Sequence, residues 1–400
     1  MMPFFQTSNS LDMENEYCLL LACAHFTVTA EQERDIQKLQ KTKLDWDILL
    51  AAASRHGILY LLYRNLTRHS SLVNNVFLKK LHALVFQGNT DSLFYTSTLL
   101  KLIQIFNQED IPVTPFKGPV LSQILYNNPA IRTYGDLDIL VHRQDVHRAS
   151  QLLIRMGYTP EISLNEREVS LYINTEDNII FRQNDSQALV ELHWEISGQY
   201  TSKPINLDYY DKRLGTITIG GKSVSTLSNE DLLIYLCIHG CKHQWTRLEG
   251  LCCVSELIKN CPEMNWDHII HYSHELKCKR ILLLGLALTQ SLLNVALPLE
   301  IATSIQEDKN LPSLVKQVHA LLFPHLGNKQ HPGQENRFSL FHLKVRDNSV
   351  DAIRYGLALL FQPTYQEWQT WPLPSNLTFL YYFYRPLRLG WEWGRRRSDG

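Results

Sequence analysis

The sharpest chemical signal in the chain is a pair of acids around one leucine, in the run Gly135–Val141, which reads G-D-L-D-I-L-V. Side chains alternate between the two faces of a strand, so Asp136 and Asp138 are expected to point the same way and Leu137 into a core. Two strand steps separate them by about 7 Å, which allows both carboxylates to bind one pair of divalent ions. Such an ion pair suits in-line attack on phosphorus, and oxygen ligands favour Mg²⁺ or Mn²⁺ over zinc.

A bare Asp-x-Asp pair is more commonly an exposed strand end with two solvated acids, so its neighbours decide the interpretation. The apolar run at residues 190–194 predicts a second strand with Glu191 and His193 on one face. We expect Glu191 to be the third carboxylate, and a packed or hydrogen-bonding role for His193 rather than metal ligation. Weaker candidates for the third carboxylate are Asp177, Asp185 and Glu195.

Two basic residues precede the acids. Lys117-Gly118 ends an apolar run that predicts a strand, and a helix is expected to follow. That order places a turn and a helix N-terminus beside the acids, where phosphate oxygens can bind. Lys117 and Arg132 could each neutralise triphosphate charge, although a surface cation is an equally good interpretation of either one alone.

A second polar cluster occupies residues 237–247. Its alternating Cys and His suggest zinc, but residues two apart on a helix diverge by about 200°, so one ion could take Cys237 with Cys241 or His239 with His243, not all four. The preferred interpretation is a polar helix face turned toward a phosphate or an acceptor, with a purely structural polar face as the alternative. That face comprises His239, Lys242, His243 and Arg247.

Hydrophobic periodicity divides the chain into three regions. Residues 1–109 and 228–400 have helical spacing, and residues 110–227 alternate short apolar runs with turns. In the middle region the pattern predicts strands at 113–116 and 137–141, helices at 120–126 and 146–156, and hairpins at 178–182 with 188–196 and at 216–219 with 223–226.

Bulk composition excludes several classes of protein. The net charge of -1 over 400 residues gives no overall field toward DNA, RNA or an acidic membrane. Residues 1–10 do not have the pattern of a signal peptide, and eight scattered cysteines favour reduced thiols. The most apolar run, 281–299, is interrupted by polar residues and predicts a buried helix rather than a transmembrane segment. We therefore expect a cytoplasmic protein.

Aromatic and basic residues gather at the C-terminus, between residues 379 and 397. Contact with a membrane surface is one interpretation, and a terminal helix packed on the body with a solvated basic tip is the more ordinary one. Pro386 and Gly390 are expected to interrupt any long helix there.

Together these motifs resemble the bacterial uncharacterised nucleotidyltransferase family, within the DNA polymerase beta-like superfamily. The resemblance covers most of the chain, and the combined set is specific although no single piece is. It rests on residues 116–121, Leu125-Tyr126, Arg132, 135–141, 190–194 and 239–248, with Trp46, 55–57 and 380–389.

The resemblance implies an α+β fold, in which a small mixed β-sheet nucleotidyltransferase core is flanked by N-terminal and C-terminal helical regions. It implies Mg²⁺ or Mn²⁺ held by Asp136, Asp138 and Glu191, with Lys117 and Gly118 forming the turn before a helix. The implied reaction moves a nucleoside monophosphate from a nucleoside triphosphate to an unidentified acceptor and releases pyrophosphate. A small-molecule acceptor is favoured, because the near-neutral net charge disfavours long nucleic acid.

The sequence also departs from the family pattern. Family members usually read K-W-L-x-D after the segment equivalent to Arg247-Leu248, whereas this chain has E-G-L-C-C at 249–253. Gly118-Pro119 likewise stands where the wider superfamily has Gly-Ser. These departures motivate an alternative function, a catalytically inactive module that binds a nucleotide or a partner.

Overall fold

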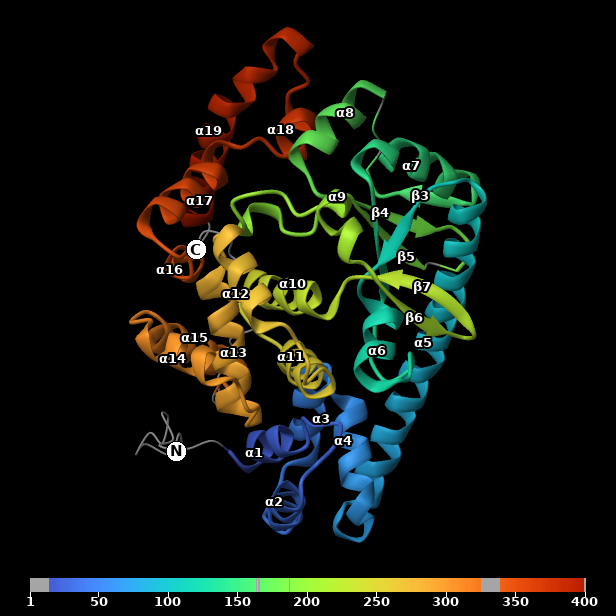
Figure 1. Cartoon of the computed structure of the whole chain (residues 1–400), viewed down its shortest axis with the longest axis vertical. Helices are drawn as coiled ribbons and strands as arrows, with labels where there is room; N and C mark the ends of the chain where they lie inside the picture. Colours follow the sequence, from blue (N-terminus) through green and yellow to red (C-terminus); the bar gives the residue numbers. More distant parts are fainter. Residues whose placement is uncertain (1–13, 163, 165, 187, 325–338, 399–400) are drawn as a thin grey trace.

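The chain folds as a mixed sheet with helices before it, around it and after it (Figure 1). The computed structural model describes residues 14–162, 164, 166–186, 188–324 and 339–398. This arrangement confirms the predicted α+β class and the small mixed sheet.

The central sheet has five strands in the order β1-β2-β5-β4-β3. β2 pairs parallel with β5, while β1–β2, β4–β5 and β3–β4 are antiparallel. A separate hairpin joins β6 to β7. The predicted strands and both hairpins are confirmed, whereas β3 was not anticipated. The strands are β1 Val113–Pro115, β2 Asp136–Val141, β3 Tyr158–Pro160, β4 Asn178–Gln183, β5 Leu189–His193, β6 Gly215–Ile219 and β7 Lys222–Thr226.

Among the described residues, four α-helices belong to the region of the sheet. The predicted helices after β1 and β2 are confirmed as α6 and α7, and α8 and α9 lie in the connections before β4 and β6. Their bounds are α6 Gly118–Tyr126, α7 Val146–Arg155, α8 Glu166–Thr175 and α9 Leu207–Tyr210.

The two faces of the sheet meet different surroundings. Leu137, Ile139 and Val141 of β2 enter an apolar core shared with α7 and the C-terminal half of the long helix before β1. Leu140, which points the other way, belongs to a second core that joins the N-terminal helices to those that follow the sheet. The alternation therefore turns the acids of β2 toward the second group of helices.

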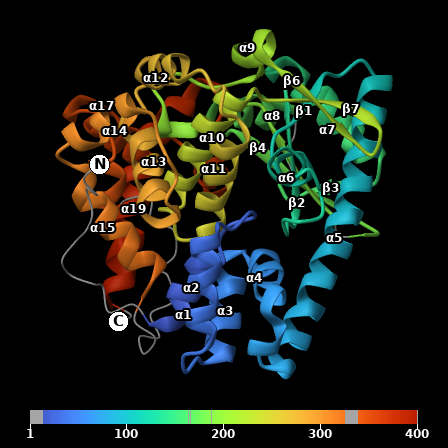
Figure 2. The same cartoon turned by 60° about the horizontal axis from the view of Figure 1, so that its bottom comes forward.

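In the part of the chain that the structure describes, five α-helices precede the sheet, and side-chain caps define several of their starts. Thr29 forms a capping box with Gln32, and Asp45 and Asn74 accept backbone N–H groups at two further starts. The last of them, α5, has 34 residues and runs along one side of the molecule (Figures 1 and 2). The five are α1 Asn15–Ala22, α2 Ala30–Gln40, α3 Trp46–His56, α4 Leu59–Leu66 and α5 Asn75–Gln108.

Helices again follow the sheet, beginning at Ser228, whose side chain caps α10 by accepting from Asp231 N. The apolar run predicted as a buried helix is α13, which packs against α10 and α11. None of the described helices is both long enough and apolar enough to cross a membrane. The helices are α10 Asn229–Lys242, α11 Leu248–Asn260, α12 Trp266–Glu275, α13 Lys279–Leu293, α14 Leu299–Glu307, α15 Leu311–Leu322, α16 Leu340–Lys344, α17 Ser349–Phe361, α18 Tyr365–Thr370 and α19 Tyr381–Ser398.

The expected interruption of the C-terminal helix is wrong, because α19 continues through Pro386 and Gly390. Proline removes one helical hydrogen bond, and ion pairs to the rest of the chain hold the helix on both sides of it. Arg385 and Arg388 both pair with the buried carboxylate of Glu367 on α18, at 3.2 and 2.6 Å. Packing of a terminal helix on the body is confirmed.

Candidate active site

The acids of β2 lie on one face of the strand, as the alternation predicts. The side chain of Asp138 is 1% exposed, and Asp136, at the first position of the strand, is partly exposed. The parallel pairing of β2 with β5 sets Asp138 directly beside Glu191. Two neighbouring strands thus bring three carboxylates to one face of the sheet.

His193 lies between the carboxylates of Asp138 and Glu191 and contacts both of them. Its Nε2 atom is 3.2 Å from Asp138 Oδ1 and 3.2 Å from Glu191 Oε2. Burial lowers the pKa of His193, but the hydrogen bonds to Asp138 and Glu191 outweigh it and raise the pKa to about 8. The imidazolium therefore holds both carboxylates in place at neutral pH.

Lys117 is the second cation at the acids. It directly precedes α6, and its Nζ lies 3.0 Å from Asp138 Oδ1. Burial opposes ionisation of the lysine, but the carboxylate of Asp138 raises its pKa. Gly118 follows with φ of +53°, and an added Cβ would lie 3.6 Å from the carbonyl oxygen of Asp136. A left-handed residue beside the acid strand explains the glycine in this turn.

The pKa values of the two β2 acids shift in opposite directions. Burial first, and then the charge of Asp138, raise the pKa of Asp136 to about 6 against the cations nearby. Burial would also raise the pKa of Asp138, but Lys117 and His193 hold it well below its usual range. His193 likewise lowers the pKa of Glu191. Asp136 is thus the carboxylate whose charge is least compensated by the protein.

The group has the composition of a site for a hard divalent cation. Ligand atoms of Asp138, Glu191 and His193 all lie within 4.8 Å of one another, and Asp136 shares their face of the sheet. The negative charge left uncompensated on Asp136 and the oxygen-rich donor set both fit Mg²⁺ or Mn²⁺. Within the described ranges, one other group could hold an ion, formed by His142, Asp208 and Asp211, and both of its aspartates are exposed.

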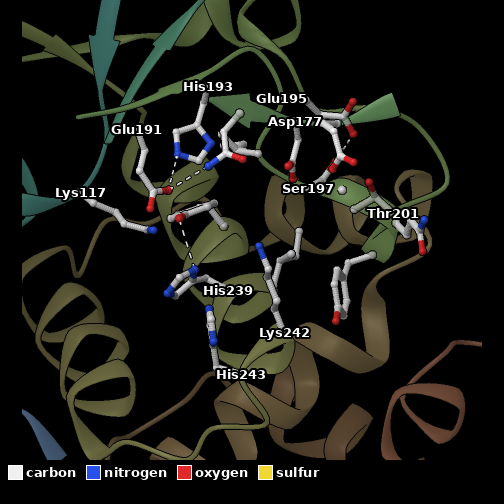
Figure 3. Close-up of a pocket in the computed structure, with 18 of the residues that line it drawn as sticks. Lys117, Asp177, Glu191, His193, Glu195, Ser197, Thr201, His239, Lys242 and His243 are labelled. Carbon is white, nitrogen blue, oxygen red and sulfur yellow. Dashed lines mark hydrogen bonds and ion pairs between the residues drawn. The ribbon is translucent and has the colours of Figure 1, made fainter. Parts of the chain in front are cut away.

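A cavity of about 1500 Å³ opens in front of the acids. Figure 3 shows Lys117, Glu191 and His193 on one side of it and Asp177 and Glu195 on another. Among the weaker candidates for the third carboxylate, Asp177 and Glu195 line the cavity, and Asp185 lies exposed in the turn at the other end of the hairpin. Burial, and then the charge of Asp177, raise the pKa of Glu195 to about 7.

Helix α10 forms the wall opposite the sheet. His239, Lys242 and His243 line the cavity, whereas Cys237 and Cys241 are buried in the apolar core on the other side of the helix. α10 thus has a polar face toward the cavity, but Arg247, which was expected on the same helix, lies beyond its end, directly before α11. Burial lowers the pKa of His239 well below its usual value, so its imidazole is neutral at pH 7.

Arg132 has a carboxylate partner at the cavity wall. Its Nη2 lies 2.8 Å from Glu249 Oε1, and Arg247 Nη2 lies 3.1 Å from the other oxygen of the same carboxylate. Both arginines line the cavity, but the Arg132 guanidinium already has a carboxylate partner. Glu249 belongs to the 249–253 segment that departs from the family pattern, and here it binds two cations of the cavity wall.

Two residues at the site were missed by sequence reasoning. Asn178 at the start of β4 donates from Nδ2 to Glu191 Oε2 at 3.1 Å, and Tyr235 lies with its ring centroid 5.7 Å from Lys117 Nζ. Each had a sequence signal: Asn178 opens the strand that is antiparallel to the strand of Glu191, and Tyr235 precedes His239 by one helical turn.

We compared the chain with solved structures, with curated proteins and with protein-family models. Among solved structures, the antibiotic-resistance factor ANT(2'')-Ia is 9% identical, with a TM-score of 0.33 over 46% of this chain and 91% of that one. An antigenic nucleotidyltransferase-like protein from Paracoccidioides brasiliensis is 18% identical, with a TM-score of 0.31 over 56% of this chain and 93% of that one. A comparison with curated proteins finds no match. The family model described as "Uncharacterised nucleotidyltransferase" matches residues 42–294, which include the whole acid cluster and α10, and the chain therefore belongs to that family.

Proposed function

We propose that the chain is a metal-dependent nucleotidyltransferase, which moves a nucleoside monophosphate from a nucleoside triphosphate to a small-molecule acceptor and releases pyrophosphate. One observation carries the proposal: Asp136, Asp138 and Glu191 meet on one face of the sheet, in front of a cavity and beside Lys117. Membership of the family supports nucleotidyl transfer in general, and the pairing of acids on β2 supports our placement of the chain in the DNA polymerase beta-like superfamily.

The three carboxylates are our assignment for the metal ligands. When bound, Mg²⁺ or Mn²⁺ would activate the attacking oxygen and neutralise charge on the leaving phosphates. His193 positions Asp138 and Glu191 through its two contacts at 3.2 Å. Glu191, whose pKa is lowered by His193, is ionised at neutral pH and is available to take the proton of the acceptor hydroxyl.

Phosphate binding is assigned to the start of α6. Lys117 supplies a charge beside Asp138, and the N-terminus of α6 at Gly118 adds backbone N–H groups that attract anions. Arg132 is assigned to fixing the loop before β2 through Glu249 rather than to direct phosphate binding.

The acceptor is assigned to the wall formed by α10, where His239, Lys242 and His243 face the cavity. Pockets for single small molecules span about 300–1000 Å³. A cavity of about 1500 Å³ therefore has room for a nucleotide and a second small molecule together. The cytoplasmic location and the domain limits at residues 109 and 227 stay predictions.

The test is to incubate the full chain with each labelled nucleoside triphosphate, Mg²⁺ or Mn²⁺ and a fractionated small-molecule extract, and to follow labelled acceptor and pyrophosphate. We expect metal-dependent labelling that falls at least about 100-fold in Asp136→Asn, Asp138→Asn and Glu191→Gln, since each removes a ligand of the ion. The matched control is Asp208→Asn with Asp211→Asn, which alters the other group able to hold an ion and leaves the cavity intact. Labelling that survives in the three cavity variants would contradict the assignment.

The alternative of a binder without turnover is less favoured, because the chain retains all three carboxylates and Lys117. Calorimetry distinguishes the two functions. An inactive binder would take up nucleotide with no pyrophosphate released in the presence of any extract fraction.

A further inference from the structure

The C-terminal helices expose an unusual share of large apolar side chains. Of the twenty such side chains exposed among the described residues, thirteen lie between positions 340 and 391. Scattered exposed apolar residues are normal, but a concentration of them marks a surface that binds something. This part of the chain follows the region matched by the family model, which ends at residue 294.

Helix α17 has two unlike faces. Asp351, Tyr355 and Leu359 are buried and line the cavity. Successive residues turn by about 100° around a helix, so Ile353 and Leu357 lie on the opposite face. Their exposed fractions are 63% and 51%. An apolar stripe thus covers the outer face of a helix whose inner face already packs on the protein.

Helix α19, which packs against α17, repeats the pattern. Its inner face carries Arg385 and Arg388, both ion-paired to Glu367. The opposite face carries Phe383, Leu387 and Trp391, of which 65%, 71% and 64% of the surface is exposed. We call the exposed apolar side chains of α17 and α19 the outer apolar surface. Its members are Val350, Ile353, Leu357, Leu360, Phe361, Tyr382, Phe383, Leu387 and Trp391.

Charge accompanies this surface. Residues 340–400 contain eight Lys or Arg and five Asp or Glu, a net charge of +3, while the whole chain carries -1. Three successive arginines begin at Arg395, whose guanidinium lies 4.8 Å from the ring centroid of Trp391. Aromatic and aliphatic side chains on one helix face, followed in the sequence by a run of arginines, are typical of helices that lie in the interface of an anionic bilayer.

We propose that the outer apolar surface binds the surface of a membrane that contains anionic phospholipid, with α17 and α19 lying in its plane. The apolar side chains enter the boundary between head groups and acyl chains, and the net positive charge of residues 340–400 is attracted to the lipid phosphates. Because the inner face of α17 lines the cavity, a bound chain holds that cavity within about one helix diameter, roughly 10 Å, of the lipid. The inference goes beyond the proposed function and does not depend on it.

A second copy of the chain is the main rival occupant. Two outer apolar surfaces that faced each other would also bring two segments of charge +3 together, whereas anionic lipid neutralises that charge. The charge therefore favours lipid, and the oligomeric state in solution becomes an outcome of the test.

The test is vesicle flotation of the full chain, with vesicles of phosphatidylcholine alone or mixed with phosphatidylglycerol. We expect roughly 10-fold stronger binding to the anionic vesicles, and a fall of at least about 10-fold in Phe383→Ser with Leu387→Ser and in Ile353→Ser with Leu357→Ser. All four side chains are more than half exposed, and circular dichroism checks that the variants fold.

A matched control comes from α5, where Phe86 and Leu93 are exposed to a similar extent, 66% and 59%. The variant Phe86→Ser with Leu93→Ser should bind vesicles as the native chain does. Equal loss in this control, or no loss in the α17 and α19 variants, would overturn the proposal. The proposal would also be overturned if the native chain did not bind anionic vesicles and instead formed a dimer that Phe383→Ser with Leu387→Ser dissociates.

Trp391 offers a second readout that does not depend on the serine variants. Brominated lipids quench tryptophan only at bilayer contact, so vesicles that contain them should reduce the fluorescence of the native chain. The reduction should be smaller in Trp391→Phe, which retains an apolar ring. Quenching of the same size in both proteins would place another tryptophan at the membrane and contradict the assigned orientation.

Discussion

Two substitutions, Asp136→Asn and Asp138→Asn, should change the free energy of unfolding of the metal-free protein in opposite directions. The pKa of Asp136 is raised from 3.8 to about 6, so its contribution to stability is fully present below pH 3.8 and is lost as the pH rises through 6. The ionised carboxylate then destabilises the fold by at most about 3 kcal/mol at pH 8. Water in the cavity screens part of this, and Asp136→Asn should therefore gain about 1–3 kcal/mol at pH 8 and nothing below pH 3.8.

Asp138→Asn should do the reverse. Lys117 Nζ lies 3.0 Å from Asp138 Oδ1, and the two side chains are 19% and 1% exposed. Removal of one partner of a buried ion pair leaves the other charge without compensation and costs about 3–5 kcal/mol. We expect a loss toward the lower end of that range, because Lys117 retains some contact with water.

The assay is urea unfolding at pH 8 and at pH 3.5 with a chelator present, repeated at pH 8 with Mg²⁺. Metal at ten times its Kd should stabilise the native chain by about 1.4 kcal/mol, and Asp136→Asn should gain less. Asp208→Asn is the control, since its carboxylate is 67% exposed and should change stability by less than about 1 kcal/mol. Destabilisation of both cavity variants at pH 8, or a gain in Asp136→Asn that persists at pH 3.5, would refute the uncompensated charge on Asp136.

Three further outcomes follow from contacts outside the acid cluster. Burial lowers the pKa of His56 to about 3. The neutral imidazole therefore contributes its full stability above pH 6.5, the ordinary pKa of histidine, and this contribution is lost as the pH falls below 6.5. In urea unfolding, the free energy of unfolding of the native chain should fall by about 2 kcal/mol more than that of His56→Gln between pH 7 and pH 5. An added Cβ at Gly240 would lie 2.4 Å from the ring of Trp245, so Gly240→Ala should lower Tm by several degrees. Gly390 has open space around it, so Gly390→Ala should leave stability unchanged or raise it by up to about 1 kcal/mol. Glu249→Gln leaves two guanidinium groups without their carboxylate and should cost about 2–3 kcal/mol by the same unfolding assay, with a smaller loss at high salt.

Each of these outcomes has a contrary result. Parallel pH curves for the native chain and His56→Gln would show that the buried imidazole titrates normally. An equal Tm for the two alanine variants would contradict the close approach of the ring at Gly240. Unchanged stability of Glu249→Gln would show that both arginines find solvent instead.

Local periodicity was enough to predict the acid strand and its faces. Alternation along β2 depends only on the backbone, and the apolar run around Glu191 identified the second strand in the same way. The central position of His193 was not predicted, because it depends on β5 pairing beside β2 across about fifty residues of sequence. The contact from Lys117 was not predicted either, because it depends on β1 pairing with the other edge of β2. Which strands become neighbours is decided by the packing of whole elements, not by the period of either strand.

The ion pairs between residues distant in the chain could not be predicted from the sequence either. Glu249 lies in the segment whose departure from the family pattern motivated the inactive alternative, and its carboxylate binds Arg132, 117 positions earlier in the chain. The helix through Pro386 has the same origin, since ion pairs to Glu367 outweigh the local penalty of the proline. Sequence reasoning fails at these positions because the favourable interaction comes from a residue far away in the chain.

The long helix α5 connects distant parts of the protein mechanically. Its 34 residues span about 50 Å, from contacts with α3 and α4 at one end to β1 and β2 at the other. Ser92 and Tyr95 near its middle bond the backbone of Arg132 and Gly135, and Ser92 also accepts from Tyr134. α5 is one continuous helix that is hydrogen-bonded to the loop before Asp136. A tilt of a few degrees at the end of α5 that contacts α3 and α4 would therefore shift the acid strand relative to α10. A partner that binds the amino-terminal helices could therefore change the rate of the proposed reaction without entering the cavity.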